Sequence, residues 1–215
     1  MAEAGTMRMG LLTVQIDAHF LVNTLDSIEA LVDQGKTHEI KTTARNLAAM
    51  LKSRHEAGAE INVFEQMVDL ERYIEIMNIR HDGKFDVELD ADEELSHCRI
   101  PGQILQPIVE NALTHGLGNK TGDCRLTVTG SLQEGHVFFE ISDNGVGLPP
   151  AQLLALQDVL DAADAGEGDL YQLKGVALTN IQRRIREQYG AGYGLTVQAT
   201  PKGGLTVVVR LPDIK

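Results

Sequence analysis

Two short segments of this chain combine residue types that suit a bound nucleotide. Residues 105–116 read LQPIVENALTHG and place Glu110 beside Asn111 in an otherwise apolar stretch. Residues 143–147 read DNGVG, a carboxylate followed by two glycines. A carboxamide oxygen is an acceptable Mg²⁺ ligand beside phosphate oxygens and water, and glycines let the backbone approach a flat ring closely. Together these segments predict a site for ATP and Mg²⁺.

The first segment is expected to be a helix, because its apolar residues recur at helical spacing. Asn111 and His115 are four residues apart and should therefore flank the apolar face on one side. We expect Asn111 to be a direct magnesium ligand and His115 to contact a phosphate, while Glu110 orients water or receives a proton. The alternative is that Glu110 and Asn111 only cap or solvate a surface helix.

The second segment follows a strongly apolar stretch that reads as a strand. A carboxylate at a strand end, Asp143, can accept a hydrogen bond from an adenine amino group. Gly145 and Gly147 permit positive φ and a close approach of the base. The same letters are also typical of an ordinary β-turn, so the interpretation depends on where the turn lies relative to the Asn111 helix.

A third segment, QIDAHFLVNTL at 15–25, carries His19 on a predicted helix over about 7–32. The predicted apolar stripe of this helix consists of Val14, Leu21, Leu25, Ile28 and Val32. At 100° per residue His19 lies roughly 150° from that stripe, so we expect it to be exposed. A neutral imidazole is a competent nucleophile, and His19 is our candidate phosphoryl acceptor. A histidine without chemistry is the alternative, and it is our interpretation of His38, His55, His81, His97 and His136.

A second predicted helix over 38–55 would complete a helical hairpin. Two helices bury little apolar area, and the first carries further apolar residues off its stripe, namely Leu12, Ile16 and Phe20. We therefore expect a four-helix bundle made by two chains. The break at Ala57-Gly58-Ala59 suggests a first domain over 1–58.

Beyond the break the pattern changes to alternating strands and helices, which indicates a second domain over 59–215. Helices are expected over 63–79, 102–115, 150–162 and 177–189, and strands over 85–89, 125–129, 137–141, 195–199 and 206–211. The fold class is thus α+β: the hairpin followed by an α/β sandwich with helices on one face of a mixed, mainly antiparallel sheet. Five acidic residues within 158–169 predict a mobile acidic loop.

Composition excludes several classes of function. A net charge of −12 without a block of Lys and Arg argues against nucleic acid as a partner. No run of about 18 apolar residues is present, and the first ten residues lack the order of a signal peptide. Cys98 and Cys124 are far apart and outside any CxxC motif, which favours a reducing cytoplasm over a disulfide or zinc site.

These motifs resemble those of the ATPases shared by DNA gyrase, MutL and histidine kinases, and in particular sensor histidine kinases that typically partner LytTR-type response regulators. LQPIVENALTHG looks like the Asn box, DNGVG like the first glycine box, and QIDAHFLVNTLDSI like the phosphoacceptor box. The resemblance covers nearly the whole chain. It implies His19 as phosphoacceptor, Asn111 as magnesium ligand, Glu110 as its acidic neighbour and Asp143 as the adenine partner.

The resemblance also implies an ATP lid between Gly147 and Gly175, with Lys174 as the nearest cation on it. Several residues depart from the family pattern. Ala18 replaces Pro and Val22 replaces Phe beside His19, the second glycine box LKGVAL at 173–178 keeps one glycine of three, and Leu205 replaces a Thr after Gly204. We therefore expect modest ATP affinity.

The resulting hypothesis is the cytoplasmic portion of a homodimeric, autophosphorylating histidine kinase that uses ATP and Mg²⁺. A response-regulator aspartate would be the next acceptor, and any membrane contact would come through a sensor encoded upstream. Two alternatives remain. The lost glycines fit a degenerate dimeric signalling scaffold, and in a clamp-type ATPase of the same superfamily His19 would have no role.

Overall fold

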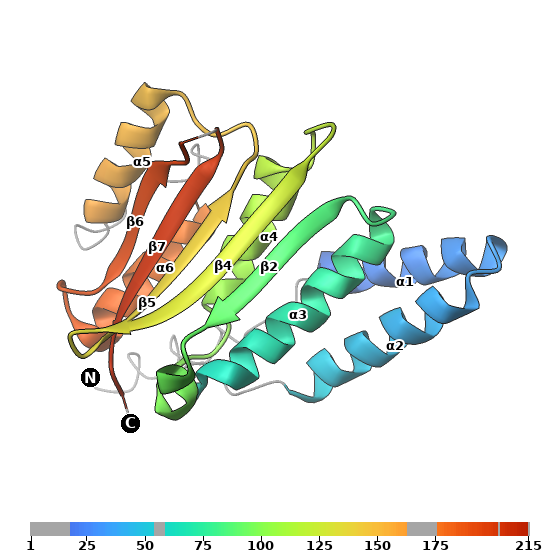
Figure 1. The fold of residues 1–215 in the computed structure, drawn as a ribbon, viewed down its shortest axis with the longest axis horizontal. Helices are drawn as coiled ribbons and strands as arrows, with labels where there is room; N and C mark the ends of the chain where they lie inside the picture. Colours follow the sequence, from blue (N-terminus) through green and yellow to red (C-terminus); the bar gives the residue numbers. More distant parts are fainter. Residues whose placement is uncertain (1–17, 54–58, 163–175, 202, 215) are drawn as a thin grey trace, which may run out of the picture.

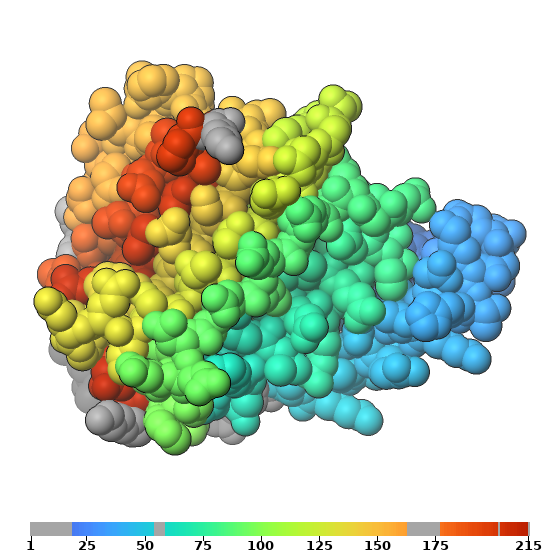
Figure 2. Space-filling model, viewed as in Figure 1, coloured from blue at the N-terminus to red at the C-terminus, as the bar shows by residue number. Residues whose placement is uncertain are grey.

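A computed structural model describes residues 18–53, 59–162, 176–201 and 203–214 of the chain. The N-terminal part is a helical hairpin of α1 (Ala18–Asp33) and α2 (Thr37–Lys52), followed by α3 (Val63–Arg80). Figure 1 shows the hairpin at one end of the molecule, with α3 between it and the sheet. In the space-filling view the hairpin forms an extension at one side of the body (Figure 2). The predicted helices over 38–55 and 63–79 are confirmed to within a few residues.

The body is built on a five-stranded sheet in the order β2-β4-β5-β7-β6. The strands are β2 (Phe85–Ala91), β4 (Cys124–Gln133), β5 (His136–Asp143), β6 (Gly194–Ala199) and β7 (Leu205–Pro212). β2 pairs with β4 in parallel, and the other neighbours are antiparallel. The predicted mixed, mainly antiparallel sheet is therefore confirmed.

Helices cover one face of the sheet and leave the other open (Figures 1 and 2). They are α4 (Leu105–Asn111) with its π-helical continuation η2 (Ala112–Gly116), α5 (Pro150–Asp161) and α6 (Val176–Tyr189). Side chains of α5 and α6 provide acceptors for two backbone N–H groups of the edge strand β6. Gln157 accepts a hydrogen bond from the Val197 N–H, and Gln182 accepts one from the Leu195 N–H. The helices that flank the cavity described below are thus fixed to the sheet.

The face of α1 that packs within the chain differs from the predicted stripe. Phe20, Thr24 and Leu31 are buried, whereas Leu25 and Val32 are 58% and 59% exposed. Thr24 is tolerated inside because its hydroxyl donates to the Phe20 carbonyl, 2.7 Å away. The prediction failed because α1 has two apolar faces, and periodicity does not decide which one a given neighbour covers.

The hairpin packs on α3 and on the turn that follows α3, and its contacts include one aromatic pair and two polar pairs. The rings of Phe20 and Tyr73 lie 5.3 Å apart, centroid to centroid. The Asn46 amide donates to Glu75 at 2.6 Å. An ion pair between Lys36 and Asp82, 3.2 Å long, is largely exposed and adds little. This docking places the hairpin beside the helical layer of the body.

Three further differences concern local structure. The helix predicted over 102–115 begins only at Leu105, because Gln103 has φ +62° and so breaks the helix. Residues 158–161 are the last turn of α5 rather than part of an acidic loop, and residues 163–169 lie outside the described residues. The short elements β1 (Glu60–Asn62), β3 (Arg99–Pro101) and η1 (Glu93–His97) were not predicted, since three to five residues carry no readable period.

Cys98 and Cys124 are both buried, and neither forms a disulfide in the described part of the chain. The predicted helical turns before residue 18 lie outside the described residues. Among the helices that the structure describes, none is long and apolar enough to cross a membrane.

Candidate nucleotide-binding site

A cavity of about 140 Å³ lies between the sheet and the helical layer. Its polar lining residues are Asn111, His115 and Asp143, which the sequence analysis selected from separate segments. The remaining lining is glycine or apolar and comprises Ile108, Ala112, Gly116, Ile141, Val146, Gly147, Leu148, Leu156, Leu178, Leu205 and Val207. A mostly apolar cavity with a few convergent polar groups is typical of a small-molecule site.

Asp143 is the last residue of β5 and is only 4% exposed. Its Oδ1 accepts a hydrogen bond from the Gly145 N–H at 2.7 Å, and the Leu205 N–H also donates to the carboxylate. Burial raises the pKa of the Asp143 carboxyl, and these two hydrogen bonds and the charge of Lys120 offset part of that rise. The carboxylate is therefore fixed in place at the cavity wall.

Glycines allow three segments to meet around Asp143. A Cβ atom on Gly145 would collide with the Gly116 carbonyl, and one on Gly204 would collide with the Asp143 carbonyl. Gly147 has φ +63°, and a Cβ there would lie 2.9 Å from the Gly204 carbonyl oxygen. The glycines of DNGVG thus allow close packing of the backbone around Asp143. Of the two, Gly147 also lines the cavity and Gly145 does not; their predicted contact with the base stays a prediction.

Asn111 ends the regular part of the helix and is half-buried. The turn that follows is π-helical, with the Leu117 N–H bonded to the Ala112 carbonyl at 2.8 Å. The Asn111 side chain lines the cavity and makes no hydrogen bond to another described residue. Within the described residues no group of three His, Cys, Asp or Glu side chains forms a metal site. A Mg²⁺ ion here would take the Asn111 oxygen together with phosphate oxygens and water, which fits its usual ligands.

Glu110 does not line this cavity. It faces a second cavity of about 450 Å³ on the other side of α4, which also contains Phe20 of α1 and Ala177, Asn180 and Arg184 of α6. Successive helix residues point about 100° apart, so Glu110 and Asn111 serve different sides of one helix. Ala177, which belongs to the altered second glycine box, lies in this second cavity, whereas its neighbour Leu178 lines the first.

His19 is exposed on α1, as predicted. The Asn23 amide nitrogen, one turn further on, lies 3.1 Å from Nδ1 and 3.2 Å from Nε2 of the imidazole. His19 lines neither cavity, whereas the neighbouring Phe20 lines the larger one. The structure therefore brings together Asp143, Asn111 and His115, and it leaves His19 apart from them. Lys174 and Gly175 lie outside the described residues.

The apolar wall of the cavity was not predicted from the sequence. Leu156, Leu178, Leu205 and Val207 come from α5, α6 and β7. The periodicity of these helices and strands can be recognised in the sequence. The order of strands in the sheet, which brings β7 next to β5, cannot be recognised there.

Comparison with known proteins agrees with this arrangement. A family model of histidine kinase-, DNA gyrase B- and HSP90-like ATPases matches residues 99–215, and a histidine kinase model matches residues 7–85. The first match spans more than half of the chain and includes every residue of the smaller cavity. The chain belongs to the family of histidine kinase-, DNA gyrase B- and HSP90-like ATPases.

Two relatives are sensor kinases. The chain is 29% identical over 202 residues to the sensor histidine kinase YesM of Bacillus subtilis (strain 168), an alignment that covers 94% of this chain and 32% of YesM. It is 27% identical over 199 residues to the sensor protein kinase HptS of Staphylococcus aureus (strain USA300), covering 92% and 37%. The chain thus spans about a third of the length of these curated relatives.

Among solved structures, the catalytic domain of the histidine kinase ThkA in a nucleotide-free form aligns with a TM-score of 0.51 at 17% identity. The alignment covers 73% of this chain and 97% of that domain. It shows that the two proteins share a fold.

The raised pKa of Asp143 leads to a prediction. Because the folded state holds this proton more tightly than the unfolded chain, ionisation costs stability as the pH rises through the folded pKa. At neutral pH we expect the Asp143→Asn variant to melt at or above the wild-type temperature without nucleotide, with the difference shrinking as the pH is lowered. ADP and ATP affinity should both fall, by similar factors of about 10 or more, since adenine is common to both.

Thermal melting across pH and ADP titration measure the two effects. Asp90→Asn, which removes an exposed carboxylate from β2, is the control and should change neither. Unchanged ADP affinity in Asp143→Asn would show that the base does not bind this carboxylate.

Proposed function

We propose that this chain is the dimerisation and catalytic portion of an ATP-dependent histidine kinase that phosphorylates itself on His19. The observation that carries the proposal is the single cavity in which Asp143, Asn111 and His115 converge. Membership of the ATPase family supports an adenine nucleotide as the ligand, with the base on Asp143 and the phosphates near Asn111 and His115.

In the proposed reaction a ring nitrogen of His19 attacks the γ-phosphorus of ATP. A P–N bond forms, the bond from that phosphorus to the bridging oxygen breaks, ADP leaves and the imidazole loses one proton. The transition state of phosphoryl transfer is loose, so catalysis needs mainly positioning and charge neutralisation. When bound, Mg²⁺ supplies part of that neutralisation at the phosphate oxygens.

Glu110 is our candidate for the proton acceptor. It lies on the side of α4 that faces the hairpin, in the cavity shared with Phe20. A carboxylate within reach of an approaching imidazole can take up the proton as the P–N bond forms. Because His19 lines neither cavity, the hairpin of the same chain or of a second copy must move to bring it to the nucleotide.

We further propose residues 1–58 as the dimerisation and phosphotransfer domain and residues 59–215 as the ATP-binding domain. Val22, Leu25 and Val32 of α1 are 54%, 58% and 59% exposed. Their spacing places them on one face of the helix, away from the buried Phe20 face. A second copy that covers this face would form the predicted four-helix bundle.

The dimer proposal predicts the effect of charges on that face. Leu25→Lys should weaken self-association by about 10-fold or more, because burying a leucine contributes about 1.5–3 kcal/mol and a lysine would lose it. Ala30→Lys adds the same charge to an exposed position on another side of α1 and should leave association unchanged. Sedimentation equilibrium of both variants measures the difference. Equal association constants would argue for a different dimer surface or a monomer.

The partner that receives the phosphoryl group is proposed to be a response-regulator aspartate, of LytTR type. We place the chain in the cytoplasm, joined to the membrane only through a sensor that precedes it. The two family matches favour an active kinase over the weakly nucleotide-binding scaffold that the altered second glycine box suggested. The histidine kinase match over residues 7–85 favours a kinase over a clamp-type ATPase.

Incubation with γ-labelled ATP and Mg²⁺ tests the proposal. We expect label on the protein that is lost in acid and retained in base, as for a phosphoramidate. Release of labelled phosphate without protein label would support the clamp-type ATPase instead. Absence of both ADP binding and label would support the scaffold.

A further inference from the structure

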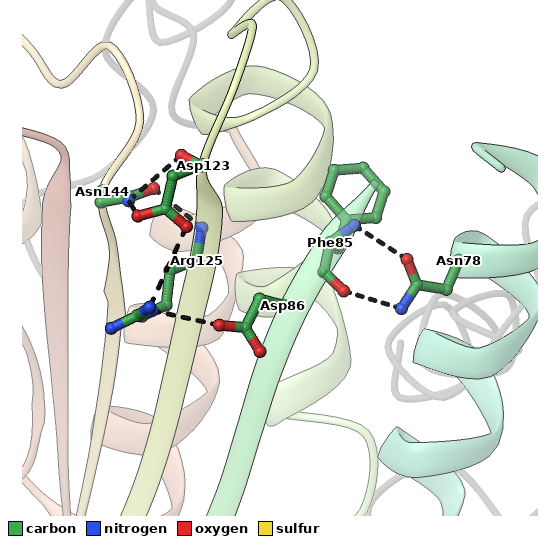
Figure 3. A network of polar contacts seen from close by, with 6 residues as sticks. All are labelled: Asn78, Phe85, Asp86, Asp123, Arg125 and Asn144. Atoms are coloured by element: carbon green, nitrogen blue, oxygen red, sulfur yellow. Dashed lines mark hydrogen bonds and ion pairs between the residues drawn. The ribbon is translucent and has the colours of Figure 1, made fainter. Parts of the chain in front are cut away.

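Asn144, the second residue of the DNGVG turn, lies outside the nucleotide cavity, and all its polar groups are engaged. Its side-chain Oδ1 accepts from the Arg125 N–H at 2.9 Å. Its Nδ2 donates to the Asp123 carbonyl at 3.2 Å and to Asp123 Oδ2 at 3.4 Å. Its backbone N–H donates to the Arg125 carbonyl at 3.1 Å, and its carbonyl accepts from Lys120. Figure 3 shows the side chain directed at Asp123 and Arg125.

These contacts extend the sheet beyond its last regular pair. The β4–β5 ladder ends with Leu126 opposite Asp143. At the next position, the backbone N–H of Asn144 still pairs with the Arg125 carbonyl. The acceptor for the Arg125 N–H is the Asn144 side chain, an amide that stands in for a backbone carbonyl. The ladder therefore gains one more pair while the main chain is already free to turn.

The turn that follows Asn144 shapes one wall of the nucleotide cavity. Directly after Asn144 the Gly145 N–H turns back to the Asp143 carboxylate, and the Val146 N–H bonds to the Gly116 carbonyl at 3.1 Å. The first bond closes the turn on Asp143, and the second joins the turn to Gly116 at the end of the Asn111 helix. The direction in which the Asp143 side chain points thus depends on where the chain leaves the ladder.

We propose that Asn144 is a positioning residue for nucleotide binding: it fixes the exit of the chain from β5 and thereby the orientation of Asp143 toward the base. The inference rests on the proposed function, since it assumes that the cavity binds an adenine nucleotide. Arg125 also pairs with Asp86 at 3.2 Å and Asp123 at 4.0 Å, but these side chains are 57–68% exposed. Exposed ion pairs contribute little. Asn144 carries the effect because it is half-buried and pairs with both the N–H and the carbonyl of Arg125.

Three variants test this role. Asn144→Ala removes the side-chain hydrogen bonds to Arg125 and Asp123 and should raise the ADP dissociation constant by up to about 10-fold, the upper end of the net contribution of one hydrogen bond. Asn144→Asp keeps an acceptor for the Arg125 N–H but sets a carboxylate against that of Asp123, and it should lose a similar factor. In the double variant Asn144→Asp with Asp123→Asn, donor and acceptor of the side-chain pair exchange places, while the bond to the residue-123 carbonyl stays lost. ADP affinity should therefore recover in part, to a value between those of Asn144→Asp and the wild type.

The readout is ADP affinity together with the rate of self-phosphorylation at saturating ATP. A positioning role raises the dissociation constant and the KM for ATP and leaves the saturated rate within about twofold. Asp123→Asn alone is the matched control and should bind ADP as the wild type does.

The outcomes separate this inference from the proposed function. If the wild type binds no ADP, the proposed function fails. If the wild type binds ADP and Asn144→Ala binds it equally well, the positioning role is overturned while the function stands. A double variant that melts at a higher temperature than Asn144→Asp but binds ADP no better would also overturn the role.

Discussion

The His19→Gln variant is expected to incorporate no phosphate from ATP and to bind ADP within about twofold of the wild type. The exposed imidazole is the only nucleophile that the proposal assigns, and a glutamine amide of similar size cannot form the P–N bond. His19 lines neither cavity, so its replacement should not disturb the nucleotide. Labelling with γ-labelled ATP and ADP titration of the same preparation measure both effects.

His38→Gln is the matched control. His38 is also exposed on the hairpin, on α2, and its loss should leave labelling unchanged. Labelling of His19→Gln at the wild-type rate would show that another residue accepts the phosphoryl group.

Asn111→Ala is expected to slow Mg²⁺-dependent phosphorylation about 100-fold or more, on the scale of removing one group that stabilises transition-state charge. The variant should fold normally. Asn111 is half-buried and has no side-chain hydrogen bond to another described residue, and alanine favours a helix, so the free energy of unfolding should change by only about 0.5 kcal/mol. Rate measurements over a Mg²⁺ series and thermal melting separate the two quantities.

The control for Asn111 is Asn119→Ala, an exposed asparagine just beyond the same helical segment. It should change neither the rate nor the melting temperature. If Asn111→Ala lost stability and activity in parallel, the residue would be part of the helix surface without a role at the metal.

Much of the fold was readable from the sequence because period and composition change sharply along the chain. The strands over β4 and β5 alternate clearly, and the turn after Asp143 is marked by its glycines. The proximity of Asp143 to Asn111 and His115 followed from a family resemblance. Periodicity alone contains no information about which strands become neighbours.

The errors have specific physical causes. On α1 two apolar faces exist, and only the structure shows that the Phe20 face packs on α3 while the Leu25 face stays exposed. A π-helical turn after Asn111 leaves no trace in a 3.6-residue pattern. Glu110 keeps its proposed role, but it faces a different cavity from its neighbour Asn111, because adjacent helix positions point in different directions.

Asn144 shows a different limit. It belongs to a common turn motif, in which Asp143 and the glycines, but not Asn144, were selected as candidate site residues. Its importance lies in contacts with residues 120–125, about twenty positions earlier, which only the pairing of β4 with β5 brings near.

The central claim is that His19 receives the γ-phosphoryl group of ATP. Mapping of the labelled peptide under alkaline conditions, after reaction of the wild-type chain with γ-labelled ATP and Mg²⁺, tests it most directly. We predict label on the peptide that contains His19 and on no other. Label on a peptide that contains His115 or His38, or complete conversion of ATP to free phosphate without a labelled peptide, would contradict the account.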